Sequence, residues 1–387
     1  MRHLLVPLLL FTACGPCDRL ASGDALRAPD GLPRCLPPGA PLAARSLERL
    51  EARALQAEDE GDGALMLACA DEALRLDERH GHAAHLRAAA LVALERWSDA
   101  QEAYTVALAL EPDDPFILAG AAELYVSRLP YARSRSIAGV ALAERGLAKA
   151  EAGIDGEAEA ELLLRLHLLA AWGMADLGDF RGALPHARAA VALRPDDRDA
   201  QVELGRALFE LTRFQEAASV LQSWTSRSED DAEAFFLLGL SLERIPGAEA
   251  LAEAALARAT GLDPEAFPPP VPLDSRWVDE AIAALPQSEK RLLERARVPV
   301  RLEALPALDD LRAEDPPLSP TAVGMFRGPP LGLDAPEPRE ILLFTRNLAR
   351  SSRDAAGVRE QVRITLLHEL GHLAGENEAD LRARGLE

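Results

Sequence analysis

The stretch Leu366–Asp380, LLHELGHLAGENEAD, contains the pattern His368-Glu369-Leu370-Gly371-His372. Residues four apart lie on one face of a helix, so His368 and His372 direct two imidazoles to a common point. This spacing suits a single zinc ion. Glu369 points about 100° round the helix and so lies beside that point, where a carboxylate can take a proton from water.

The pattern HExxH is the arrangement found in zinc peptidases, and it needs a third ligand. Gly375 follows the second histidine by three residues and is a natural end for the helix. The chain can then turn back and bring Glu376, Glu378 or Asp380 towards the metal. We predict Glu378, which completes HExxHxxGxxE, as the third ligand, with Asp380 as the alternative. The histidines could instead be ordinary core or surface side chains of a helix.

The composition limits both the core and the partners. The 387 residues are 48% hydrophobic but only 4% aromatic, so the core must consist mainly of Leu, Ala and Val, which favours close-packed helices. The formal net charge of −21 disfavours nucleic-acid binding, because little positive charge is available to neutralise phosphates. The same charge disfavours direct electrostatic attraction to anionic lipid.

The N-terminal residues have the pattern of a processing segment. Met1–His3 is a short basic start, and Leu4–Thr12 is a mainly apolar run that is too short to span a bilayer. The small residues before Cys14 resemble the lipobox of bacterial lipoproteins, although Phe11 stands where Leu is usual. We therefore predict a signal peptide over residues 1–13 and lipidation of Cys14. An ordinary secretory signal and an uncleaved N-terminus are the alternatives.

A lipidated Cys14 implies attachment to a membrane by acyl chains alone, in the cell envelope. Gly15 in place of Asp fits sorting to the outer membrane, so we predict the outer membrane or the periplasmic face as the location. Residues 14–46 are rich in Pro, Gly and Ala and are predicted to form a flexible tether.

Three further cysteines can form a disulfide or remain free. Cys17 and Cys35 flank a loop and can pair outside the cytosol. Cys69 lies within a helical pattern, and we interpret it as a small buried hydrophobic residue. No cysteine lies near His368, so the sequence gives no indication of a Cys-rich structural zinc site.

A helical pattern with a period of 34 residues extends over residues 47–265. Ala171, Gly205 and Gly239 recur at this interval. Small residues at fixed positions let paired helices approach closely, and a Pro near the end of a unit stops its second helix. The units are 47–80, 81–114, 164–197, 198–231 and 232–265, with a longer unit at 115–163.

These units resemble tetratricopeptide repeats. In the second unit Ala88, Ala100, Tyr104, Ala107 and Pro112 fall at the positions typical of that family. The resemblance implies an α-solenoid whose concave groove binds a protein substrate or partner. The alternative is that the helices only space the C-terminal domain from the membrane. The sequence identifies neither the partner nor the oligomeric state.

A Pro-rich linker over residues 266–276 separates the repeats from a second domain, residues 277–387. Trp277–Arg297 is amphipathic and is predicted to form a helix that breaks near Pro286. Apolar and β-branched runs predict three strands. These strands are expected at residues 298–305, 323–327 and 340–344.

A last helix, capped by Asp354, is expected to run to about Ala374. It is apolar on most of its circumference and should therefore be buried. The predicted fold class is thus mainly α, with a tetratricopeptide α-solenoid followed by a small α/β domain.

Residues 277–387 resemble the small zincin-like metallopeptidases of the minigluzincin type. The blocks that carry this resemblance are VPVRLE, VGMFRGPPL, REILLFTRNLARS and the final stretch with HELGH. The resemblance implies Zn²⁺ bound by His368 and His372, with Glu369 as the catalytic base. It also implies an acidic third ligand, here Glu378, at a place where Asp is common in the family.

The resemblance further implies hydrolysis of a peptide bond. A substrate strand could pair with an exposed sheet edge, for which we predict residues 340–344. Zincins often add a Tyr, His or Arg that stabilises the oxyanion. This domain has no Tyr and no further His, which leaves Arg327 and Arg346 as candidates.

Two functions follow from these observations. The first is a membrane-anchored zinc metallopeptidase whose repeats recruit a protein substrate or partner. The alternative is a non-enzymatic tetratricopeptide adaptor or assembly lipoprotein with a structural or degenerate zinc site. Glu369 separates the two, because a structural zinc site needs the histidines but has no use for a base.

Overall fold

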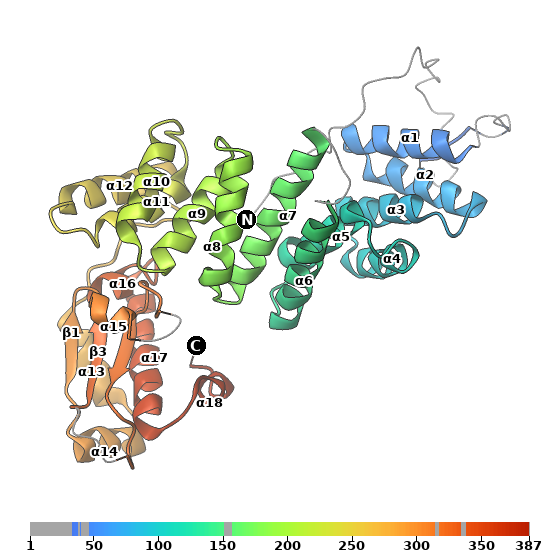
Figure 1. Ribbon diagram of the computed structural model, residues 1–387. Coiled ribbons are helices and arrows are strands. Elements are labelled where there is room, and N and C mark those ends of the chain that lie inside the picture. The colour runs from blue at the N-terminus through green and yellow to red at the C-terminus, as the bar shows by residue number, and fades with distance from the viewer. Residues whose placement is uncertain are drawn as a thin grey trace. The chain divides into compact units, whose positions relative to one another are not determined.

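The computed structural model describes residues 33–37, 39, 46–150, 157–313, 317–333 and 338–386 of the chain (Figure 1). The chain forms two compact units, Met1–Glu203 and Leu204–Glu387, and we describe each by itself. The predicted signal peptide, Cys14 and Cys17 lie outside the described residues. None of the helices within the described part of the chain has the length and apolar character needed to span a membrane.

The first unit consists of helices that pack in consecutive pairs. Small side chains let these helices pack closely. Ala88, Ala100 and Ala107, for example, are completely buried between neighbouring helices. Most helices begin at a side-chain cap, such as Asp62 or Asp114, which accepts hydrogen bonds from the first turn. The helices are α1 (Leu47–Asp59), α2 (Gly63–Leu76), α3 (Gly81–Ala93), α4 (Trp97–Leu110), α5 (Pro115–Glu123), the π-helix η3 (Leu124–Arg128), α6 (Arg133–Ala150), α7 (Glu157–Asp176) and α8 (Phe180–Leu193).

The predicted longer unit contains an extra turn of helix. There α5 continues directly into η3, and α6 is longer than the second helices α2 and α4 of the regular units. Glu123, at the junction of α5 and η3, accepts hydrogen bonds from Arg128 and from Arg165 of α7. The departure from the 34-residue period therefore corresponds to the added π-helix η3 and the longer helix α6.

A disulfide joins Cys35 to Cys69 and so ties residues 33–37 to α2. Cys35 thus pairs with Cys69, which excludes the Cys17–Cys35 pair that the sequence allowed. Cys69 is fully buried, as expected of a small hydrophobic residue, but its sulfur is oxidised. The sequence did not reveal this pair because the two residues meet only after α1 and α2 have packed against each other.

The helical pairs continue into the second unit. Helix α9 (Arg198–Glu210) crosses the boundary between the units, and α10 to α12 belong to the second. A mixed region of helices and strands follows, so the predicted mainly α fold with a small C-terminal α/β part is confirmed. The elements are α10 (Phe214–Thr225), α11 (Ala232–Leu242), α12 (Glu249–Leu262), α13 (Ser275–Ala284), α14 (Gln287–Ala296), α15 (Leu308–Leu311), α16 (Thr345–Ala349), α17 (Ala355–Ala374) and α18 (Glu378–Ala383).

Three strands form one sheet in the order β1-β3-β2. Strand β1 (Val300–Glu303) runs parallel to β3 (Glu340–Phe344), and β2 (Gly324–Arg327) runs antiparallel to β3. Each predicted strand is present. The prediction that residues 340–344 offer an exposed edge is wrong, because β3 is paired on both sides. Four consecutive apolar residues of β3 are buried, as is typical of a central strand.

Candidate metal centre

Helix α17 carries the HExxH pattern and forms the core of its domain. The Asp354 side chain caps the helix by accepting a hydrogen bond from the Gly357 N–H. Val362, Leu366 and Leu370 are buried against the sheet and α13. This packing fixes the rotation of the helix and so determines where its two histidines point.

The structure brings the three predicted ligands together. The Nε2 atoms of His368 and His372 lie 3.0 Å apart. The Glu378 Oε1 lies 3.2 Å from the Nε2 of His372 and 3.7 Å from that of His368. Among the described residues, these form the one group of three His, Cys, Asp or Glu side chains whose ligand atoms converge, all within 4.8 Å of one another.

Each imidazole is oriented from behind by a backbone carbonyl. The Nδ1 of His368 lies 2.6 Å from the Leu386 oxygen, and the Nδ1 of His372 lies 3.1 Å from the Glu376 oxygen. A carbonyl only accepts, so each Nδ1 carries a proton and donates it. This leaves the lone pair of each Nε2 directed at the common point, as in metal-binding histidines. The sequence analysis missed both carbonyls.

Local chain geometry places Glu378 beside the histidines. Gly375 ends α17 with φ 93°, and Asn377 starts α18 with its side chain as the cap. Asp380, the alternative ligand, belongs to this cap, because its carboxylate accepts from the Asn377 N–H. The Glu376 carboxylate pairs with Arg384. Of the three acidic candidates, Glu378 alone converges on both imidazoles.

Glu369 lies on the buried side of the same helix. Its side chain is 5% exposed and faces β2, where it accepts a hydrogen bond from the Phe326 backbone N–H. Burial raises the pKa of Glu369 to about 7, against the opposing effects of His368 and the Phe326 N–H. The sequence did not indicate Phe326, because a backbone donor leaves no mark in the residue type.

The donor set fits zinc. Catalytic zinc takes three protein ligands, from imidazole nitrogen and carboxylate oxygen among others, and one water. Bonds of about 2.0–2.1 Å to a tetrahedral ion put neighbouring ligand atoms about 3.3 Å apart. The observed separations of 3.0, 3.2 and 3.7 Å bracket this value. His368, His372 and Glu378 would therefore hold the ion.

Gly371 lets α18 approach α17. A Cβ at this position would lie 2.3 Å from the Leu381 Cδ2 and 2.7 Å from the Glu376 Oε2. We expect Gly371→Ala to displace α18, which carries Glu378, and to weaken metal binding about tenfold, as loss of an outer contact does. The measurement is zinc affinity by competition with a chelating dye.

The matched control is Gly261→Ala in α12, because a Cβ there meets no atom within 4 Å. That variant should keep its zinc affinity and gain about 0.5–1 kcal/mol of stability from the better helix former. Equal zinc affinities in both variants would contradict the role given to Gly371.

Neither arginine suggested as an oxyanion donor is free of carboxylate partners. The Arg327 guanidinium pairs with Asp310 and Glu340, and that of Arg346 pairs with Glu243. Both arginines therefore take part in contacts that hold the domain together.

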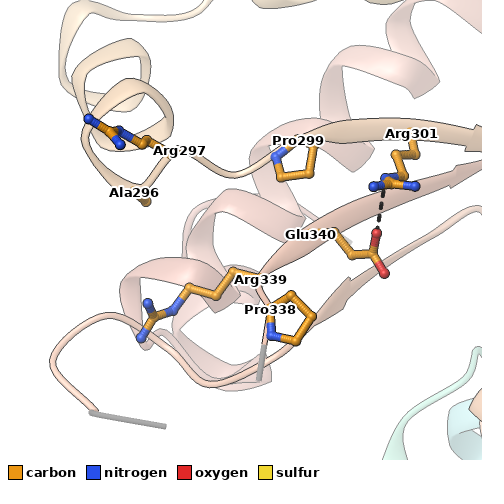
Figure 2. Close-up of a pocket in the computed structure, with 7 residues that line it drawn as sticks. All are labelled: Ala296, Arg297, Pro299, Arg301, Pro338, Arg339 and Glu340. Carbon is orange, nitrogen blue, oxygen red and sulfur yellow. Dashed lines mark ion pairs between the residues drawn. The ribbon is translucent and has the colours of Figure 1, made fainter. Parts of the chain in front are cut away.

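A separate pocket lies where β1 and β3 begin (Figure 2). Arg301 pairs with Glu340 at 3.2 Å there. Arg339 donates to the carbonyls of Pro329 and Leu333 and so fixes the loop after β2. The pocket contains none of the predicted site residues. Its lining consists of Ala296, Arg297, Pro299, Arg301, Pro338, Arg339 and Glu340.

Comparisons with known proteins give the two parts of the chain different relatives. Residues 295–386 match the family model of zincin-like metallopeptidases, and residues 168–231 match a tetratricopeptide-repeat model. A search of curated proteins finds no match.

Solved structures of tetratricopeptide proteins are similar to the repeats. PilW, described as a widely conserved type IV pilus biogenesis factor, is 21% identical with a TM-score of 0.46, covering 57% of this chain and 94% of its own. Pseudomonas aeruginosa PilF is 14% identical with a TM-score of 0.48, covering 58% and 93%. YrrB, described as a tetratricopeptide protein with an unusual peptide-binding site, is 20% identical with a TM-score of 0.41, covering 51% and 93%. The chain thus combines tetratricopeptide repeats with a C-terminal domain that matches the zincin-like metallopeptidases.

Proposed function

We propose that this protein is a zinc-dependent metallopeptidase, held at the cell envelope by a lipid on Cys14, whose repeats recruit a protein substrate or partner. The observation that carries the catalytic part is the convergence of His368, His372 and Glu378 next to a buried Glu369. A merely structural site would have no use for that carboxylate.

Bound zinc would lower the pKa of a water molecule and polarise the carbonyl of the scissile peptide. The remaining work falls to residues of this chain. Glu369 accepts the proton of the attacking water and returns a proton to the leaving amine. The Phe326 N–H holds the Glu369 carboxylate in place, and the carbonyls of Leu386 and Glu376 keep the two imidazoles oriented.

We propose the outer edge of β2, in place of 340–344, as the site where a substrate strand pairs. The Phe344 N–H donates to the Val323 oxygen, so these two residues form a bonded pair. Bonded and non-bonded pairs alternate in an antiparallel ladder. The backbone groups of Gly324 and Phe326 therefore face away from β3. The Phe326 N–H is already bonded to Glu369, so the Gly324 N–H and the carbonyls of both residues are the groups left for a substrate strand.

Removal and return of the metal tests this function. The protein is incubated with a pool of unstructured peptides, and new amino termini are counted by mass spectrometry. We expect cleavage in the untreated protein, loss of cleavage after dialysis against a chelator, and recovery when Zn²⁺ is returned. Absence of cleavage from a zinc-loaded, folded protein across the whole pool would favour the non-enzymatic adaptor.

A further inference from the structure

The turn between α11 and α12, the two helices of the last repeat, contacts the domain that carries the candidate metal centre. Glu243, directly after α11, has a side chain that is only 5% exposed. It accepts hydrogen bonds from Arg346 at 2.8 Å and from Arg350 at 2.9 and 2.7 Å. Burial would raise the pKa of Glu243, but its bonds with Arg350 and Arg346 lower it, so the carboxylate stays ionised.

The next residue, Arg244, reaches two other loops of that domain. Its guanidinium donates to the Pro306 oxygen at 2.7 Å and to the Pro320 oxygen at 3.1 Å. Pro306 follows β1, Pro320 precedes β2, and the arginines bound by Glu243 follow β3. The carboxyl ends of β1 and β3 and the amino end of β2 lie at the same end of the sheet. Two adjacent residues of the repeat thus tie together all three connections at that end.

A second contact comes from the turn between α9 and α10. Thr212 has φ 57°, a conformation that non-glycine residues rarely adopt. The equivalent turns after α1 and α7 have glycine at positive φ, Gly61 and Gly178, whereas the turn after α3 has Glu95 at φ 56°. Arg312, after α15, donates to the Thr212 hydroxyl at 2.8 Å and to its carbonyl at 3.1 Å. The Thr212 side chain and carbonyl therefore have a partner outside the repeats.

The connection from Arg244 to the candidate metal centre is short. The Pro320 oxygen also accepts from the Asn347 side chain, which bonds the Ala322 oxygen as well. Strand β2 begins two residues later at Gly324, where an added Cβ would lie 3.1 Å from the Glu369 Oε1. Arg244 and Asn347 therefore fix the segment that leads directly into the strand beside the proposed base.

We propose that Glu243 and Arg244 of the terminal repeat are positioning residues for the metal centre, because they hold the segment that places β2 against Glu369. The repeat is then a structural part of the metallopeptidase domain and not a spacer. This inference deepens the proposed function and rests on the same site.

The test replaces Arg244 with methionine in the full chain, which keeps much of the apolar stem and removes the donors. Two measurements are made: hydrogen exchange of the β2 amides, and the absorption spectrum of Co²⁺ added as the probe metal. The variant loses two charge-assisted hydrogen bonds, so β2 exchange should rise by at least about tenfold. The Co²⁺ spectrum depends on the groups around the ion. It should change, because Glu369, which lies beside the ion, loses its fixed position.

Arg258→Met in α12 is the matched control, since Arg258 donates to the Glu229 carbonyl within the repeats. It should leave both measurements unchanged. Arg346→Met is the milder variant if Arg244→Met unfolds the unit, because that side chain is 47% exposed and shares Glu243 with Arg350. It should change the Co²⁺ spectrum in the same direction.

Faster β2 exchange with an unchanged Co²⁺ spectrum would reduce the repeat to a stabilising neighbour and overturn the positioning role. An unchanged result in both measurements would overturn the inference entirely. The proposed function fails independently, through absence of hydrolysis by the unmutated zinc-loaded protein, since neither measurement here depends on turnover.

Discussion

Replacing Glu369 with glutamine is expected to reduce peptide hydrolysis by about a hundredfold to ten-thousandfold while zinc remains bound. Glutamine has nearly the same shape and can still accept the Phe326 N–H, but it cannot take a proton from water at neutral pH. His368, His372 and Glu378 are unchanged, so the ligand set is complete. The measurement pairs initial rates of cleavage with zinc content by elemental analysis.

The control is Glu360→Gln, which changes an exposed glutamate of the same helix α17. Glu360 is exposed and pairs with Arg363, so its loss should leave both rate and zinc content unchanged. Hydrolysis at the normal rate in Glu369→Gln would remove Glu369 from the mechanism, even with the metal in place. Loss of zinc in the same variant would instead show that Glu369 supports the ligands.

The sequence was sufficient for those parts of the site that depend on local geometry. The spacing of His368 and His372 fixes their common face, and Gly375 followed by a capped helix brings Glu378 back to them within a few residues. The helical repeats were also readable, because small buried residues recur along them, but the predicted boundary between residues 163 and 164 falls inside α7.

The remaining features depend on contacts between residues far apart in the chain. Cys69 could not be matched to Cys35 from spacing alone, because two helices must pack before the sulfurs meet. The order of the strands was also missed, although the unbroken apolar run of β3 was a usable signal for a central strand. Backbone groups, such as the Leu386 carbonyl behind His368, leave no trace in residue identity.

Loss of a ligand is expected to have the second large effect. Full-length protein should contain one zinc per chain, and His372→Ala should contain almost none after dialysis against a weak chelator. Loss of an outer partner of a ligand costs about 10–100-fold in affinity, and loss of a ligand itself should cost more. Glu378→Ala should retain zinc weakly, because both imidazoles stay in place and water can take the vacated position.

A second histidine pair gives this experiment its control. The Nδ1 atoms of His167 on α7 and His186 on α8 lie 3.0 Å apart, the same separation as between the Nε2 atoms of His368 and His372. Within the described residues, however, no acidic or sulfur ligand converges with that pair. Burial lowers the pKa of His167 to about 4, so this imidazole is neutral at pH 7 and its lone pair is available to a metal.

His167→Ala should therefore keep the full zinc content. Two zinc ions per chain, of which His167→Ala and His372→Ala each lose one, would mean that proximity of two imidazoles suffices and that Glu378 has no special role. Zinc lost from His372→Ala and weakened in Glu378→Ala alone would place the ion at α17. Zinc binding would then depend on what the His167–His186 pair lacks. That feature is the Glu378 carboxylate, which the turn at Gly375 brings back to α17.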